Sequence, residues 1–471
     1  MTVIRDSVPD FDLTVPVLVI GAGACGMAAA LAARDAGADV VVLEQDRAPF
    51  GSTGMSYGGA CAADTASEQR LGIADSKEQF LADILAMTSG RTDPALARAI
   101  AYEAGPTIDW LADRHDVILE AEPGWTGLGH SAARLHFPAD RSGSEFVGML
   151  TGAVERCGVD SLFSARVDAL YATPENRVTG VRVRRPDGIE QIGCEKLILA
   201  TCGFGANAEM VDRYIPELKG AQYYGHEGNR GDGIVWGEAL GGTLADMGAY
   251  QALGLLSAPE CVVVPPTLTI AGGFQVNSAG RRFHNELADV SGQALRVLAQ
   301  PGAVSWIIYD DRLHQQARDG YAEYRAGEAL NPYKSADTPG GLAEATGIAA
   351  DGLAATMADV AQLKADGGRD TFGRSFADAY QLTPPYFAVR VTGALFHTQG
   401  GLQVDAHARV VGAGGRPLPN LYAGGGAARG VSGPGGWGYL PGMGLCAALT
   451  LGRLAGDHAA RSLGQATELV A

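Results

Sequence analysis

Few features of this sequence mark a secreted, metal-binding or membrane protein. The 471 residues include seven cysteines, which are scattered and never form a C-x-x-C pair, at positions 25, 61, 157, 194, 202, 261 and 446. Such an odd, scattered set argues against a disulfide framework, a zinc site or a dithiol redox centre. No apolar run approaches the roughly 18 residues of a membrane helix, and the acidic N-terminus lacks the apolar core of a signal peptide. We therefore expect a cytoplasmic location, no membrane contact and no metal.

Positive charge is also scarce. Lys and Arg number 36 against 53 Asp and Glu, which gives a net charge of −17. This balance disfavours nucleic acid and anionic membranes as partners, because both repel a negative surface. The apolar fraction of 46% and the charged fraction of 19% are ordinary for a globular enzyme. The length predicts two or three domains.

The most informative stretch is residues 15–44, VPVLVIGAGACGMAAALAARDAGADVVVLE. It begins with a β-branched run that predicts a buried parallel strand. The turn G-x-G-x-x-G, an alanine-rich helix to about residue 36 and a second β-branched run that ends at Glu44 follow. A strand before the glycines, a helix after them and an acid at the end of the next strand together predict a dinucleotide site.

Each part of that stretch has a physical function in such a site. Gly21 permits the tight turn, Gly23 lets the backbone approach a pyrophosphate, and Gly26 lets the helix pack closely on the strand. The helix N-terminus presents unpaired N–H groups and positive partial charge to phosphates. Glu44 lies at the offset where a carboxylate accepts hydrogen bonds from ribose hydroxyls. The alternative is an alanine- and glycine-packed corner, which would not explain the acid.

The rest of the chain alternates strands and helices, except in its middle. Periodicity predicts helices at 76–89, 93–114 and 143–157, a hairpin at 164–173 and 178–184, a strand at 196–200 and a last helix to about 463. Small and hydroxyl residues at 50–60 indicate either backbone against a flat ligand or a flexible loop. Residues 123–138 are loop-like and carry Trp125, His130, Arg134 and His136, which could reach a substrate but are more typical of a surface.

Taken together, these segments resemble the flavoprotein family of fumarate reductases and succinate dehydrogenases, nearest to the ketosteroid delta-1-dehydrogenases. The resemblance covers most of the chain and rests on the stretch above, residues 51–59, LILATCGFGAN, GDGI, QVNSAGRRFHNE, PPYFAVRVTGALFHTQGG and LYAGGGAARG. It implies an α/β fold, a Rossmann-like (glutathione-reductase-like) FAD-binding domain with an inserted α+β capping domain. The implied boundaries are 1–246 and 379–471 for FAD binding and 247–378 for the cap.

The resemblance also assigns cofactor residues. It implies that Glu44 holds the adenosine ribose, that Val167 meets the adenine through its backbone, and that the first glycines hold the pyrophosphate. The full predicted FAD set is Gly21, Gly23, Ala24, Gly26, Glu44, Gln45, Ser52, Thr53, Gly58, Gly59, Val167, Thr201, Gly203, Asp232, Gly425, Gly442 and Leu445. Covalently flavinylated relatives carry a histidine in the attachment region, and no histidine lies between Glu44 and Ala60. Non-covalent FAD is therefore expected.

Departures from the family pattern bear on the chemistry. Fumarate reductases carry a proton-donating arginine five residues after the Asn of an Asn-Glu pair, and here Val290 follows Asn285 at that distance. The last glycine-rich loop, GVSGPGGWGYLPGMGL, also lacks their substrate-binding arginine. It resembles instead the Y-P-G-x-G loop of the ketosteroid dehydrogenases, with one extra residue between Tyr439 and Pro441. His397 matches a histidine of the family.

These observations predict the desaturation of a cyclic ketone, with α-proton abstraction, β-hydride transfer to flavin N5 and an external electron acceptor. Tyr439 and the Gly444 N–H would polarise the carbonyl, while His397 could be base, acid or substrate donor. Arg429 either binds a substrate carboxylate, as in an oxocyclohexanecarboxylate, or pairs with an acid of the protein. Two alternatives remain: an ene reductase of a fumarate-like or other unsaturated acid, and a flavin-binding electron-transfer subunit.

Overall fold

The computed structural model describes residues 2–5, 9–124 and 126–464, and these form two compact units. The first unit comprises the residues before Pro216, Gly225–Tyr250 and the chain from His397 onward; the second comprises Pro216–Tyr224 and Gln251–Phe396. The sequence placed the inserted domain at 247–378, whereas the compact unit continues to Phe396. The reason is β17 (Tyr386–Thr398), which pairs with β15 (Val304–Asp310) and β16 (Tyr333–Ala336) in one sheet. A capping function for this unit remains a prediction.

The first unit is built on a parallel sheet, as the sequence predicts. Its central strands are β20 (Pro417–Ala423), β10 (Gly188–Leu199), β2 (Leu13–Ile20), β3 (Val40–Leu43) and β7 (Asp160–Leu162), each parallel to its neighbour. Residues 17–20 and 40–43 are buried throughout. Strands covered on both faces need such continuous apolar runs. The predicted α/β architecture is confirmed.

All five strands end at the same level. In the register of the sheet, Ile20 lies opposite both Leu43 and Leu199, Leu199 lies opposite Ala423, and Leu43 lies opposite Leu162. Ligands of open α/β sheets bind outside the carboxyl ends of the strands. The fold therefore gathers at one edge the segments that follow these ends, namely 21–26, 44–46, 200–203 and 424–426.

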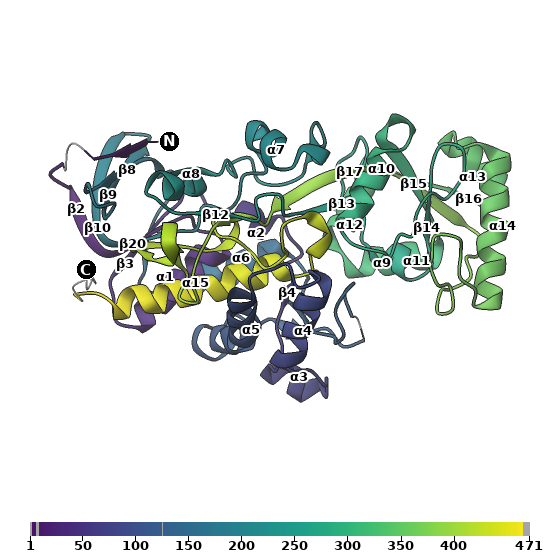
Figure 1. Ribbon diagram of the computed structural model, residues 1–471. Coiled ribbons are helices and arrows are strands. Elements are labelled where there is room, and N and C mark those ends of the chain that lie inside the picture. The colour runs from purple at the N-terminus through teal and green to yellow at the C-terminus, as the bar shows by residue number, and fades with distance from the viewer. Residues whose placement is uncertain (1, 6–8, 125, 465–471) are drawn as a thin grey trace. The chain divides into compact units, whose positions relative to one another are not determined.

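Two helices from opposite ends of the sequence lie side by side on this sheet (Figure 1), α1 (Ala24–Asp35) and α15 (Met443–Arg461). Their approach depends on glycine. A Cβ at Gly452 would lie 2.3 Å from the carbonyl oxygen of Cys25, and one at Gly456 would lie 2.0 Å from that of Ala29. Because these obstacles are backbone atoms of another helix, a methyl group fits only if the helices separate.

Gly456→Ala is therefore expected to destabilise the protein by roughly 1–3 kcal/mol, the usual cost of overpacking. Urea unfolding followed by circular dichroism measures the change. Gly148→Ala is the matched control, since Gly148 lies within helix α6 (Gly143–Arg156) and a Cβ there meets nothing within 4 Å. Helix propensity predicts that this control stabilises the protein slightly. Equal stability of the two variants would contradict the close-packing argument.

The other elements of the first unit surround this core. They are β1 (Thr2–Ile4), α2 (Gly51–Gly54), β4 (Ala60–Cys61), α3 (Ala66–Leu71), α4 (Lys77–Met87), α5 (Pro94–His115), β5 (Glu120–Ala121), β6 (Leu135–Phe137), β8 (Arg166–Ala172), β9 (Val178–Arg185), α7 (Ala208–Tyr214), α8 (Asp232–Ala239), β12 (Leu244–Ala245), β18 (Gly401–Leu402) and β19 (Arg409–Val411). The predicted helices and hairpin are present. Two predictions were too simple: residues 50–60 contain a short helix, and the loop-like 123–138 contains β6.

The second unit has a mixed sheet in the order β11 (Gln222–Tyr223), β17, β15 and β14 (Phe274–Val276), with β13 (Tyr250–Ser257) and β16 also on β17. Its helices are α9 (Thr267–Ile270), α10 (Gly292–Leu298), α11 (Asp311–Gly320), α12 (Ala322–Gly327), α13 (Pro339–Thr346) and α14 (Ala350–Asp366). Glu286 is buried here between Arg282 and Arg374, which lower its carboxyl pKa to about 2 despite burial. Glu286, the glutamate of the Asn-Glu pair, is thus engaged in two ion pairs within the second unit.

Candidate active site

The glycines of the first turn differ in what surrounds them. Gly21 has a φ of +107°, and a Cβ on Gly26 would lie 1.8 Å from the Gly21 carbonyl oxygen, so both positions need glycine for the fold itself. At Gly23 a Cβ would meet only the Thr53 hydroxyl, at 3.4 Å. Gly23 is also the N-cap of α1 and supplies no side-chain cap. The protein thus leaves open the position where a pyrophosphate would approach the helix N-terminus.

Glu44 lies directly beside this turn. Its carboxylate accepts the backbone N–H of Ala22 at 2.8 Å and that of Asp46 at 3.1 Å. Burial raises the pKa of this carboxyl, and the two backbone hydrogen bonds oppose the rise. Gln45 follows and lies against Gly228, whose Cβ would be 2.0 Å from the Gln45 amide nitrogen. The position suits a ribose hydroxyl, although the ribose contact itself remains a prediction.

Hydroxyl groups from helix α2 and from the end of strand β10 complete the predicted cofactor shell. Thr53 Oγ1 accepts the Ala24 N–H at 3.0 Å and Thr201 Oγ1 accepts the Gly233 N–H at 3.2 Å. Ser52 Oγ accepts Asn229 Nδ2 at 2.7 Å and lies 3.6 Å from Cys202 Sγ. Neither Asn229 nor Cys202 is among the residues predicted from the sequence. Cys202 adopts a φ of +61°, in the region that favours glycine, and this feature is visible in the structure but not in the sequence.

The remaining predicted cofactor positions occupy the same unit. Asp232 opens α8, and burial raises its carboxyl pKa. Val167 is buried in β8, two residues after Ala165, whose N–H donates to the Glu44 carbonyl at 2.8 Å. The other positions are glycines and the first turn of α15: Gly58, Gly59, Gly203, Gly425, Gly442 and Leu445. Cβ atoms at 58 and 59 would meet Pro138 and Phe137 at 2.8 and 2.5 Å, so these two glycines are needed for chain packing.

Three of the predicted catalytic groups come together at the N-terminus of α15. The rings of His397 and Tyr439 meet edge to face with centroids 5.4 Å apart, and a Cβ at Gly444 would lie 3.3 Å from His397 Nε2. Burial raises the pKa of the Tyr439 hydroxyl well above 10. Burial lowers the pKa of His397 to about 4. Both side chains are therefore neutral at physiological pH.

Arg429 is not in that group. Its Nε donates to Asp246 at 2.8 Å and its Nη1 donates to Asp93 at 2.9 Å, and the side chain is largely buried. Two carboxylates thus neutralise the guanidinium and take up two of its donating nitrogens. This arrangement favours the alternative that the sequence left open, an arginine paired with acids of the protein, over a substrate-carboxylate clamp.

The stretch at 123–138 reaches the surface at several positions, but its His130, Arg134 and His136 side chains are buried and are not the surface side chains that were expected. Arg134 is fully buried and donates twice to Asp75, both at 2.7 Å, and once to Asp83, at 2.6 Å. His130 is buried too, and its Nε2–H donates to the carbonyl of Pro441 at 2.9 Å. Burial lowers the pKa of His130 to about 4, so the ring is a neutral donor. This cluster therefore supports the loop that carries Tyr439; Trp125 lies outside the described residues.

Arg134→Met is expected to lower the free energy of unfolding by about 3–5 kcal/mol, because it removes the cation that neutralises the buried Asp75 and the largely buried Asp83. Thermal and urea unfolding of the purified variant measure the loss. Arg70→Met is the control, since Arg70 pairs with Glu120 where both side chains are more than half exposed. Exposed pairs contribute about 0–1 kcal/mol. A small effect of Arg134→Met would show that the buried network does not hold the loop.

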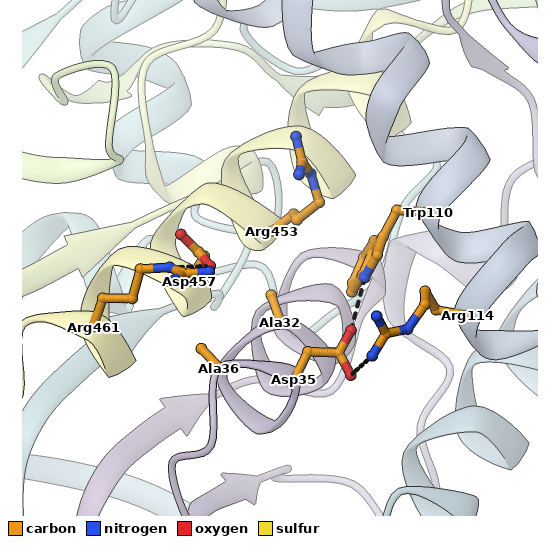
Figure 2. A pocket seen from close by; sticks show the side chains of 8 residues that line it. All are labelled: Ala32, Asp35, Ala36, Trp110, Arg114, Arg453, Asp457 and Arg461. Carbon is orange, nitrogen blue, oxygen red and sulfur yellow. Dashed lines mark hydrogen bonds and ion pairs between the residues drawn. The ribbon is translucent and has the colours of Figure 1, made fainter.

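A separate hollow lies at the far end of α1. Figure 2 shows it between α1, α5 and α15, lined by Ala32, Asp35, Ala36, Trp110, Arg114, Arg453, Asp457 and Arg461. Its volume is about 220 Å³. Its charges are already paired: Arg461 with Asp457 at 2.7 Å and Arg114 with Asp35 at 3.6 Å. It opens beside Asp35 and Ala36, at the opposite end of α1 from Gly23. We therefore do not assign the cofactor or the chemistry to it.

The described residues also bear on two other classes of protein, metalloproteins and membrane-spanning proteins. Across residues 2–5, 9–124 and 126–464, no cluster of three His, Cys, Asp or Glu side chains is arranged to hold a metal ion. Within the same described part of the chain, none of the helices combines the length and the apolar character that crossing a membrane requires.

Comparison with known proteins decides the family. The FAD binding domain family matches residues 16–445. The chain belongs to this family. It is 31% identical over 455 residues to a probable fumarate reductase of Shewanella frigidimarina, covering 95% of this chain and 75% of that one. The glycine turn and the uncapped α1 N-terminus fit the cofactor, and the protein is an FAD-binding enzyme.

Solved structures agree with this assignment. A flavocytochrome c3 fumarate reductase in an open conformation superposes with a TM-score of 0.81 at 29% identity, covering 96% of this chain and 79% of that one. A 3-ketosteroid-delta4-(5alpha)-dehydrogenase of Rhodococcus jostii superposes with a TM-score of 0.77 at 25% identity, covering 98% and 100%. The predicted resemblance to fumarate reductases and to ketosteroid dehydrogenases is confirmed. The protein is a flavoprotein oxidoreductase that acts on CH–CH groups.

Non-covalent attachment of the FAD remains a prediction. Unfolding the holoenzyme in acid or guanidinium and separating small molecules from the polypeptide is expected to release one FAD per chain. The reason is the absence of an attachment histidine in residues 45–59. Flavin absorbance that stays with the denatured chain would contradict this expectation, and mass spectrometry of peptides would then locate the bond.

Proposed function

We propose that the protein is a dehydrogenase that introduces a C=C bond next to the carbonyl of a cyclic ketone and passes the electrons to an external acceptor. The observation that carries this proposal is the convergence of neutral hydrogen-bond donors at the N-terminus of α15. Tyr439, His397 and the backbone of Gly444 lie together there, and neither side chain is charged at physiological pH.

Such a set suits a substrate oxygen that becomes negative during the reaction. Removal of an α-proton from a ketone places charge on the carbonyl oxygen, and donors fixed around that oxygen stabilise the charge. The unpaired N–H groups at the N-terminus of α15 add positive partial charge at the same place, and no acid in the first turn of the helix offsets it. A buried cationic side chain would bind a carboxylate better, and Arg429 is engaged with Asp93 and Asp246. A neutral ketone is therefore the better fit.

The cofactor would be held at the strand ends. Gly21–Gly26 and the N-terminus of α1 would bind the pyrophosphate, Glu44 the ribose, and Ser52, Thr53, Thr201 and Gly203 the remaining cofactor. Bound FAD supplies the hydride acceptor or donor. The chain's own part is to hold that cofactor at the sheet edge and to polarise the substrate carbonyl with Tyr439, His397 and Gly444.

The test is anaerobic single-turnover absorbance with the holoenzyme. A cyclohexanone-type ketone or a 3-ketosteroid is expected to bleach the flavin, and the product should contain one new C=C bond by mass spectrometry. With an artificial electron acceptor present, formation of the unsaturated product would show that the enzyme also completes the full catalytic cycle. If no ketone of either kind bleaches the flavin, the proposal is wrong.

A second candidate is an ene reductase of an α,β-unsaturated acid. The observation in its favour is the 31% identity to a probable fumarate reductase. Against it, Val290 stands where the fumarate reductases carry their proton-donating arginine. The same anaerobic absorbance measurement distinguishes the ene reductase from the ketone dehydrogenase, because an enoate would reoxidise chemically reduced flavin while the ketone would leave it reduced.

A further inference from the structure

His397 has a partner that fixes the position of its proton. The side-chain amide of Gln399, two residues along the chain, places its Nε2 2.8 Å from His397 Nδ1. The amide nitrogen can only donate, so Nδ1 of the neutral ring must accept and the ring proton must lie on Nε2. That nitrogen belongs to the edge of the ring that faces Gly444.

The oxygen end of the amide faces a hydroxyl group. Gln399 Oε1 accepts the hydroxyl of Ser432 at 3.4 Å and lies against Gly430, where a Cβ would be 2.7 Å from that oxygen. The Gln399 side chain is buried, and its backbone is held by hydrogen bonds to Ala249 and Gly430. A chain of donors thus runs from the Ser432 hydroxyl through the Gln399 amide to the imidazole.

We propose that Gln399 is a positioning residue that holds His397 in the Nε2–H tautomer, so that His397 donates a hydrogen bond to the substrate oxygen and does not serve as the base. This role of Gln399 adds detail to the proposed function. It rests on the proposed function only for the identity of the substrate oxygen that His397 contacts. The groups that face the ring are Tyr439 from the loop before α15, Gly444 from α15 and Gln399 itself. Because burial keeps both rings neutral, the donor set should be unchanged from about pH 5 to 9.

The direct test is nitrogen NMR of the FAD-loaded enzyme with labelled histidine, with the His397 signals assigned as those missing in His397→Gln. We expect an unprotonated Nδ1, a protonated Nε2 and no titration between pH 5 and 9. In Gln399→Glu the carboxylate should draw a proton to Nδ1 and raise the pKa of His397 into that range. Gln403→Glu is the matched control, since Gln403 contacts Thr243 instead of a histidine.

Turnover supplies an independent measurement. Gln399→Met keeps the length of the side chain and removes its donor, so the ring loses its orientation; kcat should fall about 10-fold or more while flavin content stays normal. Gln403→Met should leave kcat unchanged. A protonated Nδ1 in the wild-type enzyme would overturn the proposal, because His397 would then present a bare Nε2 as a base. If the tautomer is as expected but no ketone is turned over, the proposed function fails and the assignment of Gln399 stands.

Discussion

Replacing Tyr439 by phenylalanine is expected to lower the rate of flavin reduction by ketone on the order of 10²-fold or more, the usual cost of removing one preorganised donor to a developing oxyanion. The substitution removes a single oxygen and keeps the ring that packs edge to face on His397. Flavin content and stability should therefore stay close to those of the wild type. Stopped-flow absorbance under single-turnover conditions measures the effect separately from reoxidation.

The matched control is Tyr422→Phe. Tyr422 is also buried in the first unit, but its hydroxyl contacts His458 and Ser462 near the C-terminal end of α15, far from Gly444 along the helix. It should leave flavin reduction unchanged. If Tyr439→Phe reduces flavin as fast as the wild type, the hydroxyl does not polarise the substrate, and the loop at 430–445 would be cofactor scaffold alone.

The pH dependence distinguishes a donor from a base at this position. Burial raises the pKa of Tyr439, which means that the hydroxyl keeps its proton until the pH is well above 10. A rate that depends on neutral Tyr439 should therefore show no loss from this group as the pH rises from 7 to 9. A rate limited by tyrosinate acting as the base would rise through the same range.

The sequence predicts the cofactor edge of the fold well because its signals are local. Four β-branched residues, a glycine turn and a helix follow one another within 15–44, and Glu44 ends the next strand. Parallel pairing then brings every strand end to one level, as the opposition of Ile20 to both Leu43 and Leu199 shows. No long-range information beyond the parallel sheet is needed to place these residues.

The sequence does not reveal contacts between side chains that lie far apart along the chain. Arg429 finds Asp93 and Asp246, which lie 336 and 183 residues away, and no local pattern reveals these pairs. Arg134 was expected at a surface because it lies in a loop-like stretch, yet Asp75 and Asp83 neutralise it inside the protein. Gln399 lies only two residues after the predicted His397, but only the fold of the chain brings its amide back to the ring.

Gly23→Val is expected to remove bound FAD, from one per chain to nearly none, while the protein stays folded. The backbone at Gly23 has φ −80° and ψ −176°, which a valine adopts readily. A Cβ there meets only the Thr53 hydroxyl, at 3.4 Å. The valine methyls therefore fit the protein but fill the space through which a pyrophosphate reaches the helix N-terminus.

Two further glycines make this test specific. Gly148→Val introduces the same side chain at a position with nothing within 4 Å and should keep its flavin. Gly26→Ala would place a Cβ 1.8 Å from the Gly21 carbonyl oxygen, so it should lose both flavin and cooperative unfolding. Flavin absorbance per chain and circular dichroism, measured on the three purified variants, separate loss of the site from loss of the fold. A Gly23→Val protein that retains stoichiometric FAD would show that the pyrophosphate does not lie at this turn.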